Sequence, residues 1–228
     1  MWNNKMKAFT LSYDDGITQD IRFVELLNRY GLKCTFNLNS GIQTKANFWT
    51  NKEGITVSRM NMGGLKELYA GHEIAVHSLT HPDLTKFDEE TVYNELSRDK
   101  ANLESFFGTE VTGMAYPYGT HDEKVRATVK KAGLHYARTV HSTNAFDLPG
   151  DLLQLPATCH HSAENLMELA KQFVALETDT PQLFYVWGHS YEFDFDNSWE
   201  RIEEFFRIIS AREDIFYGTN YEVLSPLF

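Results

Sequence analysis

The sequence predicts a barrel of seven or eight mostly parallel strands alternating with helices, an α/β fold. Seven runs of apolar, β-branched and aromatic residues have the length of strands, and segments with helical periodicity separate most of them. Alternating strands and helices form right-handed crossovers, and about seven such repeats favour closure into a barrel over an open sheet. The chain of 228 residues fits one domain of this kind, spanning 1–228.

The strands are predicted from their residue types, and a polar segment interrupts their succession. Residues 39–61 are polar and contain glycine, which indicates a long loop or an insertion between the second and third strands. The predicted strands are residues 8–13, 33–38, 73–77, 113–117, 135–140, 152–156 and 184–188.

Three helices have clear apolar stripes and candidate first residues. Asp88 is a good N-cap for a helix over 88–107, and Gly108 ends that pattern. Ser162 and Asn197 are the candidate caps of two later helices, whose apolar residues recur at helical spacing. Stripes of this kind pack into the core.

Composition and charge exclude several classes of partner. The net charge is −11, and no basic stripe is available to neutralise phosphates, so nucleic acids and anionic membrane surfaces are poor partners. No apolar run approaches the ~18–20 residues that span a bilayer, and the first residues lead into a strand pattern, from which we expect a cytoplasmic protein. Cys34 and Cys159 lie far apart in sequence and are expected to be buried free thiols.

Two adjacent acids follow the first predicted strand. In a (β/α) barrel the chemistry lies at the C-terminal ends of the strands, so a reactive residue should follow a strand directly. Asp14 and Asp15 meet this condition, and because neighbouring strand residues point to opposite faces, one carboxylate can bind a metal while the other approaches from beside it. A plain Asp-Gly turn with Gly16 is the alternative interpretation.

A pair of histidines follows the third predicted strand. The spacing of His77 and His81 places two imidazoles on one side of a helical turn, close enough to share one ion, and Pro82 ends that turn. Two histidines and one carboxylate leave coordination positions open, as in catalytic rather than structural metal sites. A chance pair of surface histidines is the alternative. The remaining aspartate would then serve as a base for a bound water.

Aromatic residues and a further histidine follow two later strands. Tyr116, Pro117 and Tyr118 form a rigid apolar wall with hydroxyl groups that suits a sugar face, although a packed loop fits this segment equally well. His189 follows Trp187 at the end of the last strand and can protonate a leaving group, with a structural histidine as the alternative. Nearby acids that could tune His189 are Glu192, Asp194 and Asp196.

Together, these motifs resemble those of the polysaccharide deacetylases, carbohydrate esterase family four, also called the NodB-homology family. The resemblance spans most of the chain in the family's order, through residues 13–16, 77–81, 116–119 and His189. It implies a distorted (β/α)7 barrel that removes an N- or O-linked acetyl group from a carbohydrate. It also implies one divalent metal ion, which in this family is usually zinc.

The resemblance also implies a role for each matching residue. Asp14 would be the general base and His189 the general acid, while the backbone N–H of Tyr118 would hold the oxyanion together with the metal. The expected metal ligands are Asp15, His77 and His81. The expected sugar contacts are Tyr116, Pro117 and Trp187.

Two departures from the family pattern bear on activity. The arginine that orients the base is replaced by Ala115, and the nearest substitute is Arg138 in the predicted strand 135–140. The fourth motif, an acidic pair followed by tryptophan, has no match around residues 137–140. The missing arginine favours an alternative, a catalytically impaired carbohydrate-binding domain. A second alternative is a retaining glycosidase with two carboxylates ~5–5.5 Å apart.

Several residues outside these motifs have simpler interpretations. His160 and His161 follow the sixth predicted strand and could line the cleft, whereas Glu73 is expected to support its strand. A soluble acetylated sugar or oligosaccharide is the expected substrate. Histidines expected at the surface or in packing are His72, His121, His135 and His141.

Overall fold

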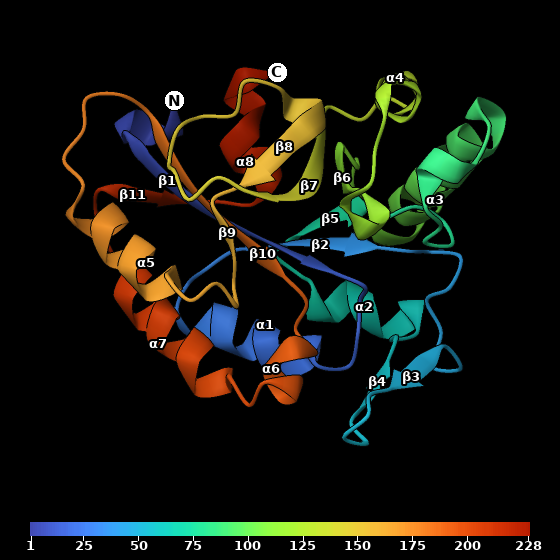
Figure 1. The fold of residues 1–228 in the computed structure, drawn as a ribbon, viewed down its shortest axis with the longest axis horizontal. Helices are drawn as coiled ribbons and strands as arrows, with labels where there is room; N and C mark the ends of the chain where they lie inside the picture. The colour runs from blue at the N-terminus through green and yellow to red at the C-terminus, as the bar shows by residue number, and fades with distance from the viewer.

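The computed structural model describes residues 1–228 and contains one large parallel sheet (Figure 1). The strand order is β8-β7-β6-β5-β2-β1-β10-β9, with β11 paired to β1, and every pairing in this sheet is parallel. The strands are β1 (Lys7–Asp14), β2 (Thr35–Leu38), β5 (Glu73–Val76), β6 (Gly113–Ala115), β7 (Tyr136–Ser142), β8 (Leu155–Ala157), β9 (Cys159–His160), β10 (Gln182–Gly188) and β11 (Ile215–Tyr217).

The two ends of this strand order belong to one short segment, which closes the sheet into a barrel. β8 pairs with β7 and β9 pairs with β10, although only Thr158 separates β8 from β9 along the chain. The Thr158 N–H donates to the Tyr185 carbonyl at 2.8 Å and continues the contact with β10. Seven strand positions therefore close the ring, as the predicted (β/α)7 barrel requires, and the pairings at this seam are brief.

Helices surround the sheet, and Figure 1 shows α1, α5 and α7 on one side of it, with α3 and α4 on another. Their apolar stripes pack on the strands in a large core cluster. The α-helices are α1 (Asp20–Arg29), α2 (Met62–Leu68), α3 (Glu89–Phe107), α4 (Glu123–Lys131), α5 (Leu166–Ala175), α6 (Glu192–Phe195), α7 (Trp199–Ile209) and α8 (Asn220–Leu224). The short 3-10 turns are Trp2–Asn4, Leu84–Lys86, Pro117–Gly119, Leu152–Gln154 and Ser225–Leu227.

The longest helix, α3, begins and ends where the sequence predicted. The Asp88 carboxylate accepts the backbone N–H of Thr91 at 2.8 Å and caps α3. Gly108 adopts a left-handed φ of 76° and ends the helix, a conformation that glycine reaches without steric cost.

Three local predictions were wrong. Residues 152–154 form a 3-10 turn rather than a strand, because the Asp151 side chain accepts the N–H of Leu153. The helix expected from Ser162 begins at Leu166, and the helix expected from Asn197 begins at Trp199. In both cases a polar turn intervenes between the predicted cap and the helix, and Asn197 itself has a positive φ of 48°.

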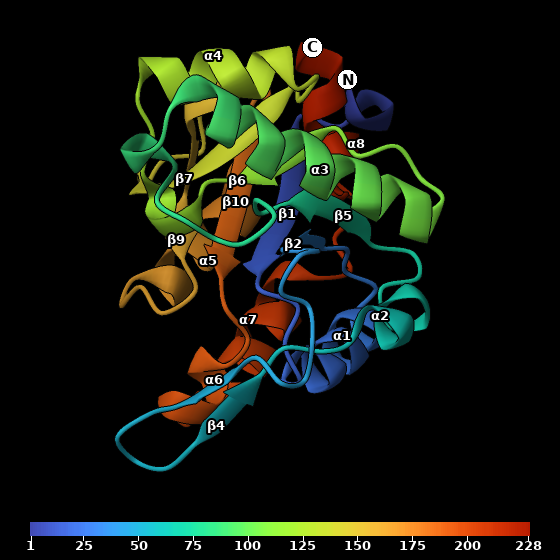
Figure 2. The ribbon, with the colours of Figure 1, turned by 90° about the vertical axis from the view of Figure 1, so that its right-hand side faces the viewer.

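The polar segment 39–61 is an insertion that contains a β-hairpin. β3 (Phe48–Thr50) pairs antiparallel with β4 (Thr56–Ser58), and Figure 2 shows this arm projecting from the barrel beside α6. Trp49 packs edge-on against Tyr191 with ring centroids 5.6 Å apart. The arm returns through an isolated bridge between Arg59 and Ile17, which brings Arg59 to the loop after β1.

The remaining expectations about packing residues are confirmed. Cys34 and Cys159 are buried free thiols. Glu73 accepts hydrogen bonds from the Thr35 and Tyr136 hydroxyls at 2.7 and 2.8 Å and supports the barrel at the end opposite the strand C-termini. Among the helices, none combines the length and the hydropathy that a membrane span requires.

Candidate active site

The predicted site residues, except Arg138 and Pro117, line one cavity of about 320 Å³ at the C-terminal ends of the strands. This position follows from the parallel sheet, because the loops after β1, β5, β6 and β10 all emerge at the same end of the barrel. The residues that line the cavity include Asp14, Asp15, His77, His81, Tyr118 and His189.

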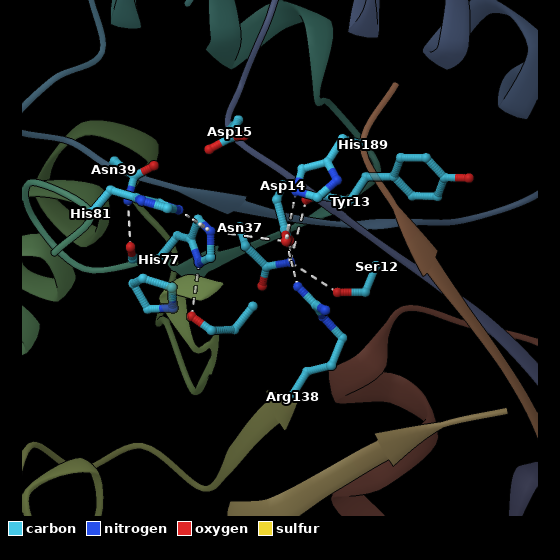
Figure 3. Close-up of polar contacts among 12 residues, drawn as sticks. Ser12, Tyr13, Asp14, Asp15, Asn37, Asn39, His77, His81, Arg138 and His189 are labelled. Atoms are coloured by element: carbon cyan, nitrogen blue, oxygen red, sulfur yellow. Dashed lines mark hydrogen bonds and ion pairs between the residues drawn. The ribbon is translucent and has the colours of Figure 1, made fainter. Parts of the chain in front are cut away.

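Asp14 lies at the centre of a buried polar network (Figure 3). Its Oδ2 is 2.5 Å from Nη2 of Arg138, and its Oδ1 accepts a hydrogen bond from the Asn37 amide at 2.8 Å. Burial alone would raise the pKa of the Asp14 carboxyl, but Arg138 and, more weakly, His77 and His189 hold that pKa below its usual range. Asp14 is therefore a fixed, ionised carboxylate.

Arg138 reaches Asp14 because of the register between two strands. Its partner across the β6–β7 pair is Ala115, the position at which the family pattern places an arginine. The guanidinium stacks on the ring of Trp187 at 4.4 Å, so the side chain is held from two directions. The neighbouring strand thus supplies the cation that Ala115 cannot supply.

His77 and His81 point their Nε2 atoms at each other, 3.1 Å apart. Nδ1 of His77 lies 2.8 Å from the Ala115 carbonyl, which can only accept, so Nδ1 carries the proton and Nε2 keeps a free lone pair. Burial lowers the pKa of His77 to about 4 and also lowers the pKa of His81, so both rings are neutral at pH 7. Two Nε2 atoms that face each other at this distance are suited to a shared cation, for which each ring would carry its proton on Nδ1.

Asp15 completes the set and is held by a residue of the insertion. Arg59 donates to Oδ1 of Asp15 at 2.8 Å and to its backbone carbonyl at 2.7 Å, while the Asp15 backbone has a positive φ of 85°. Burial raises the pKa of Asp15, but Arg59 and the nearby histidines outweigh it and bring that pKa to about 2. Asp15 is ionised at every pH at which the protein is expected to work.

These three side chains fit a divalent metal ion. One ligand atom from each of Asp15, His77 and His81 lies within 4.8 Å of the others. The donors are two neutral imidazoles and one carboxylate, a set that zinc binds with a coordination position left open. The hydrogen bond from His77 Nδ1 to the Ala115 carbonyl is the outer contact that typically orients a ligating imidazole.

His189 faces Asp14 from the other side of the cavity, with Nε2 3.7 Å from Oδ2 of Asp14. Its Nδ1 lies 3.4 Å from Oε1 of Glu192, and its backbone N–H donates to Oε2 of the same side chain at 3.1 Å. Burial lowers the pKa of His189, but Glu192 and Asp14 outweigh this effect and raise it to about 9. The imidazole is therefore protonated at neutral pH.

Of the three acids considered near His189, only Glu192 contacts it. Asp194 accepts instead from the Trp199 indole at 2.7 Å and from the Gln19 amide at 2.9 Å, and Asp196 is exposed. Glu192 lies three residues after His189 at the start of α6, where the short helix turns its carboxylate back onto the imidazole.

The aromatic residues of the rim take different positions. Tyr118 is 63% exposed and packs edge-on against His81, so its ring is free to meet a ligand. Tyr116 lines the cavity, but its hydroxyl donates to the Leu153 carbonyl at 2.8 Å. The Trp187 ring stacks on the Arg138 guanidinium and lines the cavity, whereas Pro117 is buried at the start of the turn and does not line it.

Sequence reasoning missed two residues that hold the aspartates. Asn37 is a polar residue between Phe36 and Leu38 in β2 and is the register partner of Asp14, a pattern that could have indicated an inward polar contact. Arg59 had no comparable signal, because only the path of the insertion brings it to Asp15.

Asp20 joins the loop after β1 to the loop that carries His189. Its Oδ2 accepts from the Tyr69 hydroxyl at 2.6 Å and from the Ile17 N–H at 3.1 Å, and its Oδ1 accepts from the Ser190 hydroxyl at 2.6 Å. Burial raises the pKa of Asp20 to about 6, and the three hydrogen bonds only partly offset this effect. The buried Asp20 carboxyl therefore keeps its proton to a higher pH in the folded protein than in the unfolded chain.

The raised pKa of Asp20 predicts a loss of stability as pH rises. Between its unfolded pKa near 3.9 and its folded pKa near 6, only the unfolded chain releases the proton, so the free energy of unfolding falls by up to about 3 kcal/mol across that window. Asp20→Asn removes this contribution. Urea unfolding of both proteins at pH 4, 5, 6 and 7 measures the difference, and parallel curves for the two proteins would contradict the assignment.

The fold and the site together define a class of protein: (β/α)7 barrels that carry two histidines and a pair of adjacent aspartates at the C-terminal ends of their strands. The sequence profile described as polysaccharide deacetylase matches residues 3–137, more than half of the chain, and the chain belongs to this family.

The chain is similar to peptidoglycan-N-acetylglucosamine deacetylase PgdA of Listeria monocytogenes, with 30% identity over 124 residues, covering 52% of this chain and 23% of that protein. It is 27% identical to a chitin deacetylase of Pestalotiopsis sp over 129 residues, covering 56% and 40%. The chain thus spans less than half the length of these relatives.

The fold matches a solved family member over nearly its full length. The Xyl-CE4 domain of a multidomain xylanase from the hindgut metagenome of Trinervitermes trinervoides superposes with a TM-score of 0.63 and 16% identity, covering 97% of this chain and 91% of that one. This likeness supports the barrel architecture.

Proposed function

We propose that the protein is a metal-dependent hydrolase that removes an acetyl group from a carbohydrate. The observation that carries the proposal is the position of Asp14, an ionised carboxylate fixed by Arg138, between the three-ligand cluster and a protonated His189. A base on one side of a cavity and an acid on the other are what amide or ester hydrolysis requires. The family membership supports the same reaction.

Asp15, His77 and His81 would hold the ion, which we propose to be zinc. When bound, a divalent ion lowers the pKa of water and polarises an acetyl carbonyl. The chain's own contribution begins with Asp14, which takes one proton from the attacking water as its oxygen adds to the acetyl carbon. Arg138 and Asn37 hold both Asp14 oxygens, so the base does not need to reorient for this step.

The acyl bond then breaks with help from His189. Its Nε2 gives a proton to the departing nitrogen or oxygen as the bond to the acetyl carbon breaks, so that acetate and a free amine or alcohol leave. The backbone N–H of Tyr118, on the exposed turn after β6, is our candidate donor to the oxyanion. Tyr116, Tyr118 and Trp187 supply the aromatic wall for the sugar ring.

The structure bears on both alternatives. The missing motif arginine favoured an inactive binding domain, but Arg138 occupies the place beside Asp14 that such an arginine would fill. A retaining glycosidase needs one carboxylic acid with a raised pKa. The pKa values of Asp14, Asp15 and Glu192 are all lowered, so none of these rim carboxyls is prepared for that role.

Metal removal should abolish acetate release, and substitution of any of the three metal ligands should weaken metal binding. We expect the purified protein to bind one zinc equivalent and to release acetate from N-acetylated chitooligosaccharides or O-acetylated xylo-oligosaccharides, with activity lost in chelator and restored by zinc. His77→Gln should weaken zinc binding by at least about 10-fold, because an amide does not replace a neutral imidazole lone pair.

The matched control for that variant is His135→Gln, at an exposed position before β7 and far from the site. It should retain both zinc binding and acetate release. Acetate release that chelator leaves unchanged would contradict the proposal, as would zinc binding without acetate release from any acetylated sugar.

A further inference from the structure

A second cluster of two histidines and an acid lies directly behind His189. Nε2 of His160 and Nε2 of His161 are each 3.1 Å from Oε2 of Glu192, whose other oxygen faces Nδ1 of His189. Like the first cluster, this one has three ligand atoms within 4.8 Å of one another. By composition it is a second candidate metal site.

The hydrogen bonds of His160 distinguish the two clusters. Nδ1 of His160 accepts the backbone N–H of Ser162 at 3.2 Å, so in the neutral ring the proton resides on Nε2, which faces Glu192. A ligating Nε2 needs the opposite arrangement, with the proton on Nδ1, as the Ala115 carbonyl imposes on His77. Nε2 of His160 is therefore arranged to donate a hydrogen bond to a carboxylate, and it has no free lone pair for a cation.

His161 is held in place from several sides. Its Nδ1 lies 2.9 Å from the Tyr13 hydroxyl, and its backbone carbonyl accepts from Arg201 at 2.6 Å. The ring is 2% exposed and packs so closely on β10 that a Cβ at Gly188 would clash with it. Gly188 directly precedes His189, and because it has no side chain, the His161 ring can pack against it.

We propose that His160 and His161 are positioning residues that hold the Glu192 carboxylate against His189. This inference rests on the proposed function, because the position of Glu192 affects the rate only if His189 protonates the leaving group. Oε2 of Glu192 accepts the His189 backbone N–H and lies 3.1 Å from Nε2 of both His160 and His161, which leaves Oε1 directed at Nδ1 of His189. The carboxylate then fixes the ring with Nε2 toward the cavity.

Kinetics with two substrates separate this role from general structural support. Amide hydrolysis needs a proton on the departing nitrogen, whereas 4-nitrophenyl acetate has a leaving group that departs without one. We expect Glu192→Gln to lower kcat for an N-acetylated chitooligosaccharide by at least about 100-fold and kcat for 4-nitrophenyl acetate by less than about 3-fold. His160→Ala should lower the amide rate about 10-fold or more, and His160→Gln, which keeps a donor near Nε2, should restore most of it.

The control variant is again His135→Gln, which should leave both rates unchanged. Equal losses on the two substrates in Glu192→Gln, or no recovery in His160→Gln, would show a merely structural role and overturn the inference. A wild-type protein that releases acetate from neither substrate would instead overturn the proposed function, and the inference with it.

A measurement on the wild-type protein tests the tautomer of His160 and does not depend on catalytic activity. Long-range ¹H–¹⁵N correlation spectra should show His160 with a protonated Nε2 and a bare Nδ1, and one zinc equivalent should perturb His77 and His81 only. A second bound equivalent that removes the Nε2 proton of His160 would mean that the cluster is a metal site. That result would overturn the inference while the proposed function stands.

Discussion

Asp14→Asn is expected to lower kcat for acetate release by about 10²–10⁴-fold, because the amide cannot take the proton of the attacking water. The substitution preserves the shape of the side chain and leaves Asp15, His77 and His81 in place, so zinc binding should persist. Acetate release under saturating substrate and calorimetric titration with zinc measure the two effects separately.

Two outcomes of this experiment are informative about the base. An Asp14→Asn protein that binds zinc normally and turns over at the wild-type rate would show that Asp14 is not the base. Loss of zinc binding together with activity would instead place Asp14 among the metal ligands. His135→Gln again provides the control at a distant exposed histidine.

Arg138→Met is expected to lower the free energy of unfolding by about 3–5 kcal/mol, because it leaves the Asp14 carboxylate buried without its partner. The side chains of Arg138 and Asp14 are 1% and 3% exposed, so water cannot replace the lost contact. Activity should fall as well, since the guanidinium holds Asp14 in its ionised form and fixes its orientation. Urea unfolding measures the stability and acetate release measures the turnover.

Asp14→Asn combined with Arg138→Met should recover most of the lost stability but none of the activity, because the double variant buries no unpaired charge. Arg29→Met is the matched control: its partner Glu203 is at the surface, with the arginine side chain 60% exposed, and its loss should change stability by less than about 1 kcal/mol. A loss in Arg138→Met as small as in this control would contradict the view that the Asp14 pair is essential to the fold.

The general architecture and the main site residues were predictable because they depend on local patterns. Apolar runs and helical stripes alternate along the chain, and the C-terminal ends of parallel strands must meet at one end of a barrel. The order of the motifs therefore placed Asp14, Asp15, His77, His81 and His189 at one rim, where the structure has them. The cap at Asp88 is equally local, since it involves only the next few residues.

The limits of short elements were less predictable, because competing side-chain contacts set them. Ser162 has the character of a helix cap, yet its hydroxyl lies 2.7 Å from Nδ1 of His160 and the helix begins later. The closing segment with β8 and β9 has only brief strand pairings, and its place in the barrel depends on pairing with β7 on one side and β10 on the other.

The sequence by itself determined the alternation of strands and helices, the motifs that follow each strand, and the residue types available for chemistry. Only the tertiary structure decided which groups hold those residues. The register of β6 and β7 places Arg138 beside Asp14, the insertion returns Arg59 to Asp15, and closure of the barrel brings His160 and His161 to Glu192. Spacing along the chain specifies the face on which a side chain lies, whereas contacts across strands depend on register and closure, which bring together residues as far apart as Asp14 and Arg138.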